Sequence, residues 1–398
     1  MRETKPVVAV DVSMSKLSFR AFAERVPRRD LKGKGRTVPN GRDGFLAIER
    51  ACLENGRDGE PSAAVMEATG SHHVNLAHWL ASKGIEVHVI SPSRSARQRQ
   101  AEAGAKNDDL DCLYISHVYY DGDSRPWTPG DEKLAEAKWI LRRREGAVDA
   151  LVAAKCQFRS TLSHLWPDFP LDPYGRAGAA ILRRYGDPTS LASARPSNVA
   201  KALGKAGVHV GAERLAEDLV SYAGRASFGQ WLYSESEPDW LADELERALS
   251  LKAKADALAE SAVSALRERG DFARIRGIYG IGDLGAATFL AEAGDVSRFD
   301  SPKAFVKYCR AAPKTRQSGQ YDGKGLPRDR SGNHRLYNVA KKAVLIMLRD
   351  GKDNAVTRYV TKKKSDGKLP NQAAADGAGK LIRVIYAMLR DGTDFKDE

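Results

Sequence analysis

The sequence predicts an α/β domain with a mixed sheet at the N-terminus, followed by a mainly helical chain. Short apolar runs at residues 7–12, 63–66 and 87–90 are typical of buried strands. Segments with helical periodicity lie between these runs, at residues 44–52 and 74–81. From residue 133 onward, helix-forming residues dominate long stretches. The alternation of strands and helices indicates an α/β fold for the first part of the chain.

The remaining elements of the N-terminal domain follow from local patterns. Residues 17–23 alternate as a hairpin partner of the first strand, and a third short strand is expected near Thr37 and Val38. A further helix is expected to start close to Asn107, whose side chain is a suitable N-cap. The sequence Asp-Gly-Asp-Ser-Arg-Pro-Trp-Thr-Pro-Gly after Tyr120 is typical of a linker. We expect this domain to span residues 1–125.

Helices are expected to fill the middle of the chain, residues 126–270. Residues 133–165 are rich in helix formers, whereas residues 171–238 are less regular and give no clear assignment. Apolar residues between Leu241 and Ala265 recur at spacings of three and four, which is typical of a coiled coil. This stripe could join subunits of a dimer or tetramer, or it could fold back on a helix of the same chain. A C-terminal domain is expected at residues 271–398.

The net charge of +12 is concentrated in the last quarter of the chain. From Ser301 to Glu398 there are 22 basic and 10 acidic residues, whereas the first 300 residues carry 42 of each. A basic domain beside a neutral one suggests a polyanionic partner such as DNA or RNA. A solvated basic surface would give the same composition, so charge alone leaves both interpretations open.

Other sequence features argue against several classes of protein. No stretch approaches the ~20 apolar residues that span a membrane, and the N-terminus lacks the apolar segment of a signal peptide. The four cysteines form no C-x-x-C pair, which argues against a zinc site or a disulfide framework. No phosphate-binding loop of the form G-x-x-x-x-G-K-[ST] occurs. We therefore expect a cytoplasmic protein, associated with the nucleoid if its partner is DNA.

Four acidic residues occur where a metal-binding cluster could form. Asp11 lies inside an apolar strand, Glu67 ends another, and Asp108 and Asp111 share one face at a helix start. In an RNase H-like sheet the first and fourth strands are neighbours and the last helix packs beside them, so the four carboxylates would converge. Such a cluster needs cations, and two Mg²⁺ or Mn²⁺ ions could support phosphoryl transfer. Each acid alone could instead end a strand, pair with an arginine or favour a helix N-terminus.

Two features of the C-terminal part could contact nucleic acid. Gly280 and Gly282 could bring backbone amides close to a DNA phosphate, as in helix-hairpin-helix modules, or could form a packing turn between helices. Ser318 lies in a polar, basic loop, where a Ser-Gly is usually only a turn, although nearby arginines could hold a phosphate. The basic residues that we consider candidate contacts to nucleic acid are Arg316, Lys324, Arg328 and Arg335.

Taken together, these residues resemble one known family. Val8-Ala-Val-Asp11, Met66-Glu67-Ala-Thr-Gly70 and Lys106-Asn-Asp108-Asp-Leu-Asp111 resemble the three N-terminal blocks of the DEDD transposases of the "one-ten" insertion sequences. Residues 278–282, the segments Ala312-Pro313 and Gln317-Ser318-Gly319, and Gly332-Asn333-His-Arg335-Leu336 resemble the C-terminal domain of that family. The family includes the Piv-type DNA invertases and the bridge-RNA-guided recombinases.

The resemblance implies a RuvC-like (RNase H-like) catalytic domain in which Asp11, Glu67, Asp108 and Asp111 hold divalent ions. It implies that Ser318 is the nucleophile and that strands are exchanged through a covalent phosphoserine. It further implies a composite site formed by the two domains from different subunits. A structured non-coding RNA would select donor and target DNA.

The sequence also departs from the family pattern, and other functions stay open. Asn107 and Cys112 replace the usual threonine and alanine beside the acids, and Cys309-Arg-Ala311 replaces the usual Gly-Leu, but no acid is lost. A RuvC-like nuclease or Holliday-junction resolvase would use the same acids with water as nucleophile. An actin-like sugar kinase would need nucleotide-binding loops that we do not find. A non-catalytic nucleic-acid-binding protein would keep the basic C-terminus and tolerate loss of the acids.

Overall fold

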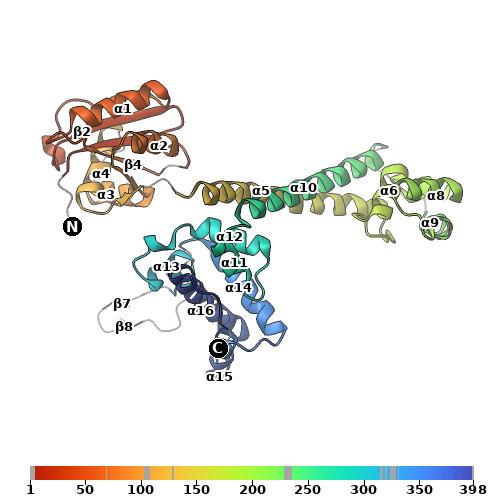
Figure 1. The fold of residues 1–398 in the computed structure, drawn as a ribbon. Coiled ribbons are helices and arrows are strands. Elements are labelled where there is room, and N and C mark those ends of the chain that lie inside the picture. The colour runs from red at the N-terminus through yellow and green to blue at the C-terminus, as the bar shows by residue number, and fades with distance from the viewer. Residues whose placement is uncertain are drawn as a thin grey trace. The chain divides into compact units, whose positions relative to one another are not determined.

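The computed structural model contains two compact units, Met1–Gly130 and Asp131–Glu398. The residues described are 5–68, 70–102, 108–127, 130–227, 235–313, 317–318, 321–322, 329 and 331–396. For residues 108, 109, 317, 318, 321 and 322 the description covers the backbone alone. Figure 1 labels most of the helices and some of the strands of the two units.

A mixed six-stranded sheet forms the centre of the N-terminal unit (Figure 1). Its order is β3-β2-β1-β4-β5-β6, and β1 pairs antiparallel with β2 and parallel with β4. β5 runs parallel to β4, while the edge strands β3 and β6 are antiparallel to their neighbours. The expected mixed sheet, with the first and fourth strands adjacent, is confirmed, and it agrees with an RNase H-like start. The strands are β1 (Val7–Val12), β2 (Lys16–Phe22), β3 (Arg36–Pro39), β4 (Ala63–Glu67), β5 (Val87–Ile90) and β6 (Arg125–Pro126).

Side chains of β1 alternate between two cores, one on each face of the sheet. Val8 and Val10 pack in the core that contains α1 (Arg42–Glu54) and α2 (Val74–Ser82). Val7 and Ala9 pack in the core that contains α4 (Asp108–Tyr120). Because both faces of the strand are covered, its apolar run is continuous rather than alternating. β4 is divided in the same way, with Ala64 and Met66 in the first core and Ala63 and Val65 in the second.

Three short elements of this unit are absent from the sequence prediction. Helix α3 (Pro92–Ala101) buries none of its residues, so it lacks the apolar stripe by which a helix is detected in a sequence. Strand β6 extends the sheet within the segment expected to be a linker, and the 3₁₀ helix η1 (Arg28–Asp30) precedes β3. The helix expected near Asn107 begins at Asp108, and Asn107 itself lies outside the described residues.

Two long helices of the second unit, α5 (Glu132–Leu165) and α10 (Glu237–Leu266), lie side by side and antiparallel (Figure 1). Leu134, near the start of α5, shares a core with Leu266 at the end of α10, and Leu165 shares another core with Leu241. Most of the apolar stripe of α10 is therefore buried within its own chain, where its alanines allow close approach to α5. The stripe does not support a seam between subunits, so the oligomeric state stays a prediction.

Within its described residues, the segment without a clear sequence assignment contains four helices. They enclose a core together with the end of α5 and the start of α10, and buried Trp166 donates a hydrogen bond from Nε1 to the carbonyl of Gly186 at 2.7 Å. Each helix buries two to four residues, and three of the four are strongly amphipathic, so a helical pattern was present in the sequence although we did not detect it. The helices are α6 (Arg176–Tyr185), α7 (Pro188–Ala192), α8 (Pro196–Lys205) and α9 (Ala212–Ala226).

The C-terminal part is a helical domain whose core also includes Leu134 and Leu141 of α5. Its central helices are α12, α14 and α16, and a two-stranded hairpin, β7 (Gln317–Ser318) with β8 (Tyr321–Asp322), precedes α14. No helix within the described ranges is long and apolar enough to cross a membrane. The helical elements are α11 (Gly270–Arg276), α12 (Asp283–Ala293), η2 (Val296–Arg298), α13 (Pro302–Tyr308), α14 (His334–Arg349), α15 (Ala355–Ser365) and α16 (Pro370–Asp391).

Candidate functional site

Asp11 and Glu67 lie at the same end of two neighbouring parallel strands. β1 and β4 pair in register up to Val10 and Met66, so Asp11 and Glu67 are the next residue on each strand. Since alternate side chains share a face, both acids belong to the face that packs against α4. Both are partly buried. Two of the four acids singled out in the sequence are therefore brought together by the strand register.

Helix α4 contributes the next acid on this face of the sheet. Asp111 lies in the first turn of α4, and the buried Leu113 and Ile115 that follow it belong to the core shared with β1 and β4. Asp111 is partly buried, with 19% of its side chain exposed. The side chain of Asp108 lies outside the described residues. Three described carboxylates thus occupy one face of the sheet.

Helix α3, which the sequence analysis missed, contacts two of these carboxylates. The Ser95 hydroxyl donates a hydrogen bond to Glu67 Oε2, and Arg99 Nη1 lies 3.6 Å from Asp111 Oδ1. An ion pair of this length between partly solvated groups contributes little to stability, but it does offset negative charge locally. One feature of the sequence could have indicated this helix as part of the site: the basic segment between Arg94 and Arg99 follows the strand next to β4.

The donor set on this face has the chemistry of a divalent-cation site. Within the described ranges, no three histidine, cysteine, aspartate or glutamate side chains lie close enough to bind one ion. Carboxylate oxygens from two strand ends and one helix are nevertheless the ligands that Mg²⁺ and Mn²⁺ prefer. The three residues have the oxygen donors that such an ion requires, and they lie on the same face of the sheet. Their assignment as metal ligands stays a prediction.

Ser318 lies in the short hairpin of the C-terminal domain, where its backbone is opposite Tyr321. Its side chain lies outside the described residues, and so do Arg316, Lys324 and Arg328. The stem of this loop is described. The Asp329 amide donates to the Ala312 carbonyl at 2.9 Å, and the Asn333 amide donates to the Tyr308 carbonyl at 2.6 Å.

Gly332 is required by the geometry of this stem. Its φ of +97° is in the left-handed region that favours glycine. A Cβ at this position would lie 2.5 Å from the Tyr308 carbonyl oxygen and 2.8 Å from that of Lys307. The chain that leaves the Ser318 loop therefore passes directly against the end of α13.

A buried carboxylate, Glu292 of α12, is bonded to the same stem. Asn333 Nδ2 donates to Glu292 Oε2 at 2.6 Å, and the Tyr308 hydroxyl donates to the Glu292 carbonyl at 3.2 Å. Arg142 of α5 donates two hydrogen bonds to the carboxylate, at 3.1 and 3.3 Å, and Lys138 Nζ lies 3.8 Å away. The Glu292 side chain is 0% exposed.

Glu292 is held in its ionised form by these partners. Burial alone raises the pKa of the carboxyl group, but the Arg142 hydrogen bonds, the Lys138 charge and the Asn333 hydrogen bond together lower it below the usual value. The sequence analysis missed Glu292. The signal was present, because Glu292 is an acid inside an otherwise apolar helical stretch, where an unpaired charge is costly.

Arg335 belongs to the same network of charges. Its Nε donates to Glu145 Oε2 at 2.9 Å and lies 3.8 Å from Glu292 Oε1. Its guanidinium is thus already balanced by two carboxylates of the same unit. These ion pairs give Arg335 a structural role, because they join α5 to α14. The contact of Arg335 with nucleic acid therefore stays a prediction.

Gly280 and Gly282, the two candidate glycines between α11 and α12, differ in their surroundings. Gly280 has φ +83°, and a Cβ there would lie 2.9 Å from the Ala343 carbonyl oxygen of α14, so this glycine serves close packing. Gly282 has open space around it and is the N-cap of α12. However, Asp283 follows at the first position of α12, where it pairs with Arg276. A carboxylate at this helix terminus opposes the approach of a phosphate.

Two family models match the chain. A model of DEDD transposases of the IS110 type, described as "Transposase", matches residues 8–167, which include the sheet and α4. A second model, described as "Transposase IS116/IS110/IS902 family", matches residues 273–355, which include α12 and the Ser318 hairpin. The two matched ranges, of 160 and 83 residues, together cover more than half of the chain.

The chain is also similar to proteins of bacterial insertion elements. An uncharacterised 43.6 kDa protein of IS110 from Streptomyces coelicolor is 26% identical over 220 residues, which are 54% of this chain and 52% of the relative. An uncharacterised 42 kDa protein of IS900 from Mycobacterium paratuberculosis is 32% identical over 108 residues, 27% of this chain and 26% of the relative. An uncharacterised 44.8 kDa protein of IS116 from Streptomyces clavuligerus is 31% identical over 118 residues, 29% of each chain. The chain thus matches between about a quarter and about half of the length of these relatives.

Proposed function

Because the chain belongs to the IS110/IS116 family of transposases, we propose that it cuts DNA strands and joins them to new partners during the movement of an insertion element. The observation that carries this proposal is the register of β1 and β4, since it leaves Asp11 and Glu67 on the face that α4 covers with Asp111. Structural roles for three separate acids would not require them to share one face.

Asp11, Glu67, Asp108 and Asp111 would hold divalent ions in this proposal. Ions bound there would stabilise the negative charge that develops on the phosphate oxygens during phosphoryl transfer. The protein supplies the carboxylates from two rigid strand ends and the first turn of a helix. Arg99 and Ser95 orient two of them before any ion binds.

Ser318 would be the nucleophile of the joining reaction. Its Oγ would attack the phosphorus of a DNA phosphodiester, forming a phosphoserine ester, while its proton passes to the sugar oxygen that leaves. Attack by the sugar hydroxyl of another strand would reverse this step and release the serine. A covalent intermediate conserves the phosphodiester bond energy, which hydrolysis by water would lose.

The basic C-terminal quarter would bind the nucleic acids. Its excess of 12 positive charges in a chain that is otherwise neutral supports a polyanionic partner. In this proposal a structured non-coding RNA pairs with donor and target DNA, and the protein acts as a dimer or tetramer that holds both duplexes. These two parts rest on the family resemblance.

The decisive experiment compares wild type with Ser318→Ala on labelled DNA in denaturing gels, with Mg²⁺ present. We expect a covalent protein–DNA adduct from wild type and none from Ser318→Ala, although the variant still binds DNA. Ser331→Ala is the matched control, because Ser331 lies on the exposed stem of the same loop. Free cleaved ends from wild type, or an adduct from Ser318→Ala, would exclude the serine mechanism and favour the RuvC-like nuclease.

A further inference from the structure

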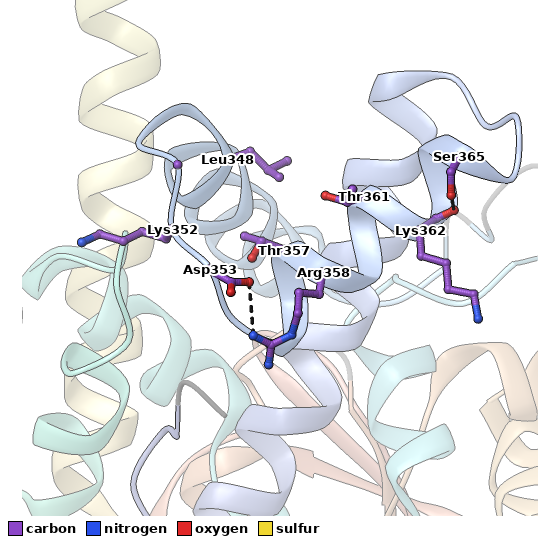
Figure 2. A pocket seen from close by; sticks show the side chains of 9 residues that line it. Leu348, Lys352, Asp353, Thr357, Arg358, Thr361, Lys362 and Ser365 are labelled. Carbon is purple, nitrogen blue, oxygen red and sulfur yellow. Dashed lines mark hydrogen bonds and ion pairs between the residues drawn. The ribbon is translucent and has the colours of Figure 1, made fainter.

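A hollow lined by basic and hydroxyl side chains lies beside α15, at the point where α14 ends (Figure 2). It has a volume of about 560 Å³ and is open to solvent. The polar residues that line it are Lys352, Asp353, Thr357, Arg358, Thr361, Lys362 and Ser365. None of these residues belongs to the candidate site described above.

The spacing of residues along α15 builds one wall of this hollow. Arg358, Thr361, Lys362 and Ser365 recur at intervals of three and four, so they share one face of the helix. The opposite face carries the buried residue Val360. Figure 2 shows Arg358 and Lys362 extending toward the same side of α15. Two cations and two hydroxyl groups thus point away from the domain core.

The charge of this wall is only partly balanced. Asp353 is the one acid among the lining residues, and it lies 3.2 Å from Arg358. Both side chains are more than half exposed, so their ion pair is weak and can rearrange. Lys352 lies at the rim, with its Nζ 4.4 Å from the centre of the exposed Tyr279 ring. Lys352 therefore connects the hollow to the turn that precedes α12.

We propose that this hollow binds a phosphate group of a nucleic-acid backbone, held by Arg358 and Lys362 and assisted by the Thr361 hydroxyl. Arginine and lysine donors suit phosphate, and the guanidinium can turn from Asp353 to a phosphate oxygen. A hollow that is open on one side admits a continuous chain, whereas a pocket for a small molecule encloses its ligand. This proposal rests on the proposed function, because the phosphate would belong to the nucleic acid on which that function acts.

The test measures binding of the full-length chain to labelled duplex DNA and to labelled single-stranded RNA at several salt concentrations. The double variant Arg358→Gln/Lys362→Gln removes two charges from the hollow. The matched control, Lys363→Gln/Lys364→Gln, removes two charges from the same helix at positions that do not line the hollow. Glutamine keeps the helix propensity of all four positions. Circular dichroism and thermal melting verify that each variant is folded.

We expect the first variant to lower the slope of log affinity against log salt by about 1 to 2, and to weaken binding about tenfold or more near 100 mM salt. The control should change the slope by less than about 0.5. An effect on duplex DNA alone would identify DNA as the source of the phosphate, and an effect on RNA alone would identify RNA. Equal losses in both double variants would mean diffuse attraction and would overturn the proposed site.

A change of opposite sign provides an independent check. Asp353→Asn removes the acid of the hollow and keeps both cations, so we expect several-fold tighter binding of the nucleic acid that the first variant loses. Unchanged or weaker binding by a folded Asp353→Asn variant would contradict the phosphate site. If wild type itself binds neither DNA nor RNA at low salt, the proposed function fails as well. If wild type binds and the Arg358→Gln/Lys362→Gln variant matches it, the hollow alone is excluded.

Discussion

Replacing Arg142 with alanine should loosen the connection between α5, α12 and the stem of the Ser318 loop. The guanidinium donates two hydrogen bonds to the buried carboxylate of Glu292. Removing them leaves this carboxylate with the Lys138 and Arg335 charges, each 3.8 Å away, and with the Asn333 amide. The variant therefore weakens the compensation of a buried charge without abolishing it.

The size of the effect follows from these contacts. Complete loss of compensation for a buried ion costs about 3–5 kcal/mol, and a hydrogen bond to a charged group contributes about 1.5–3 kcal/mol. Half of the Arg142 side chain is exposed, and part of the charge on Glu292 stays balanced, so the lower range applies. We expect the local opening free energy of α12 to fall by about 1.5–3 kcal/mol.

Hydrogen–deuterium exchange measures this change where it occurs. A loss of that size should accelerate exchange of the protected amides in α12 and at the start of α14 by about tenfold to about 150-fold. Arg143→Ala is the control, because the next residue of α5 is exposed and lies over the Trp139 ring at 5.1 Å. Unchanged α12 exchange in Arg142→Ala, or equal acceleration in Arg143→Ala, would refute the argument.

Three further predictions concern other residues. Since folding lowers the pKa of Glu292, the ionised carboxylate stabilises the fold above its unfolded pKa, near 4.5, and this contribution is lost as the pH falls through the lower folded pKa. In thermal melts recorded at several pH values, Glu292→Gln should therefore reduce the fall of the melting temperature at acid pH. An equally steep fall in the variant would contradict the prediction. Asp111→Asn should abolish strand cleavage in Mg²⁺ while leaving the melting temperature within a few degrees, because its ion pair with Arg99 is long and partly solvated; full cleavage would remove Asp111 from the site. Gly280→Ala should destabilise the second unit by about 1–2 kcal/mol or more in denaturant titrations, whereas Gly282→Ala should be nearly neutral, and equal effects would show that the contact with α14 is unimportant.

Several features of this protein could be predicted from the sequence because they depend on local patterns. The runs at residues 7–12, 63–66 and 87–90 form strands, since a strand covered on both faces is apolar at nearly every position, with Asp11 and His88 as the exceptions in these runs. Asp11 could be singled out for the same reason, because it interrupts such a run. The excess of charge after residue 301 is likewise a property of composition alone.

Partners that are distant in the sequence were decided only by the tertiary structure. The stripe of α10 is equally suited to another subunit or to α5, and the fold selects α5. Helix α3 has no apolar stripe, so its contacts with Glu67 and Asp111 follow only from its position beside the sheet. Two elements supply the positive charges that compensate Glu292. Arg142 of α5 lies 150 residues before it in the sequence, and Arg335 lies at the start of α14. Local periodicity reports which face of an element is buried, but the choice of the element that covers it depends on shape and charge across the folded chain.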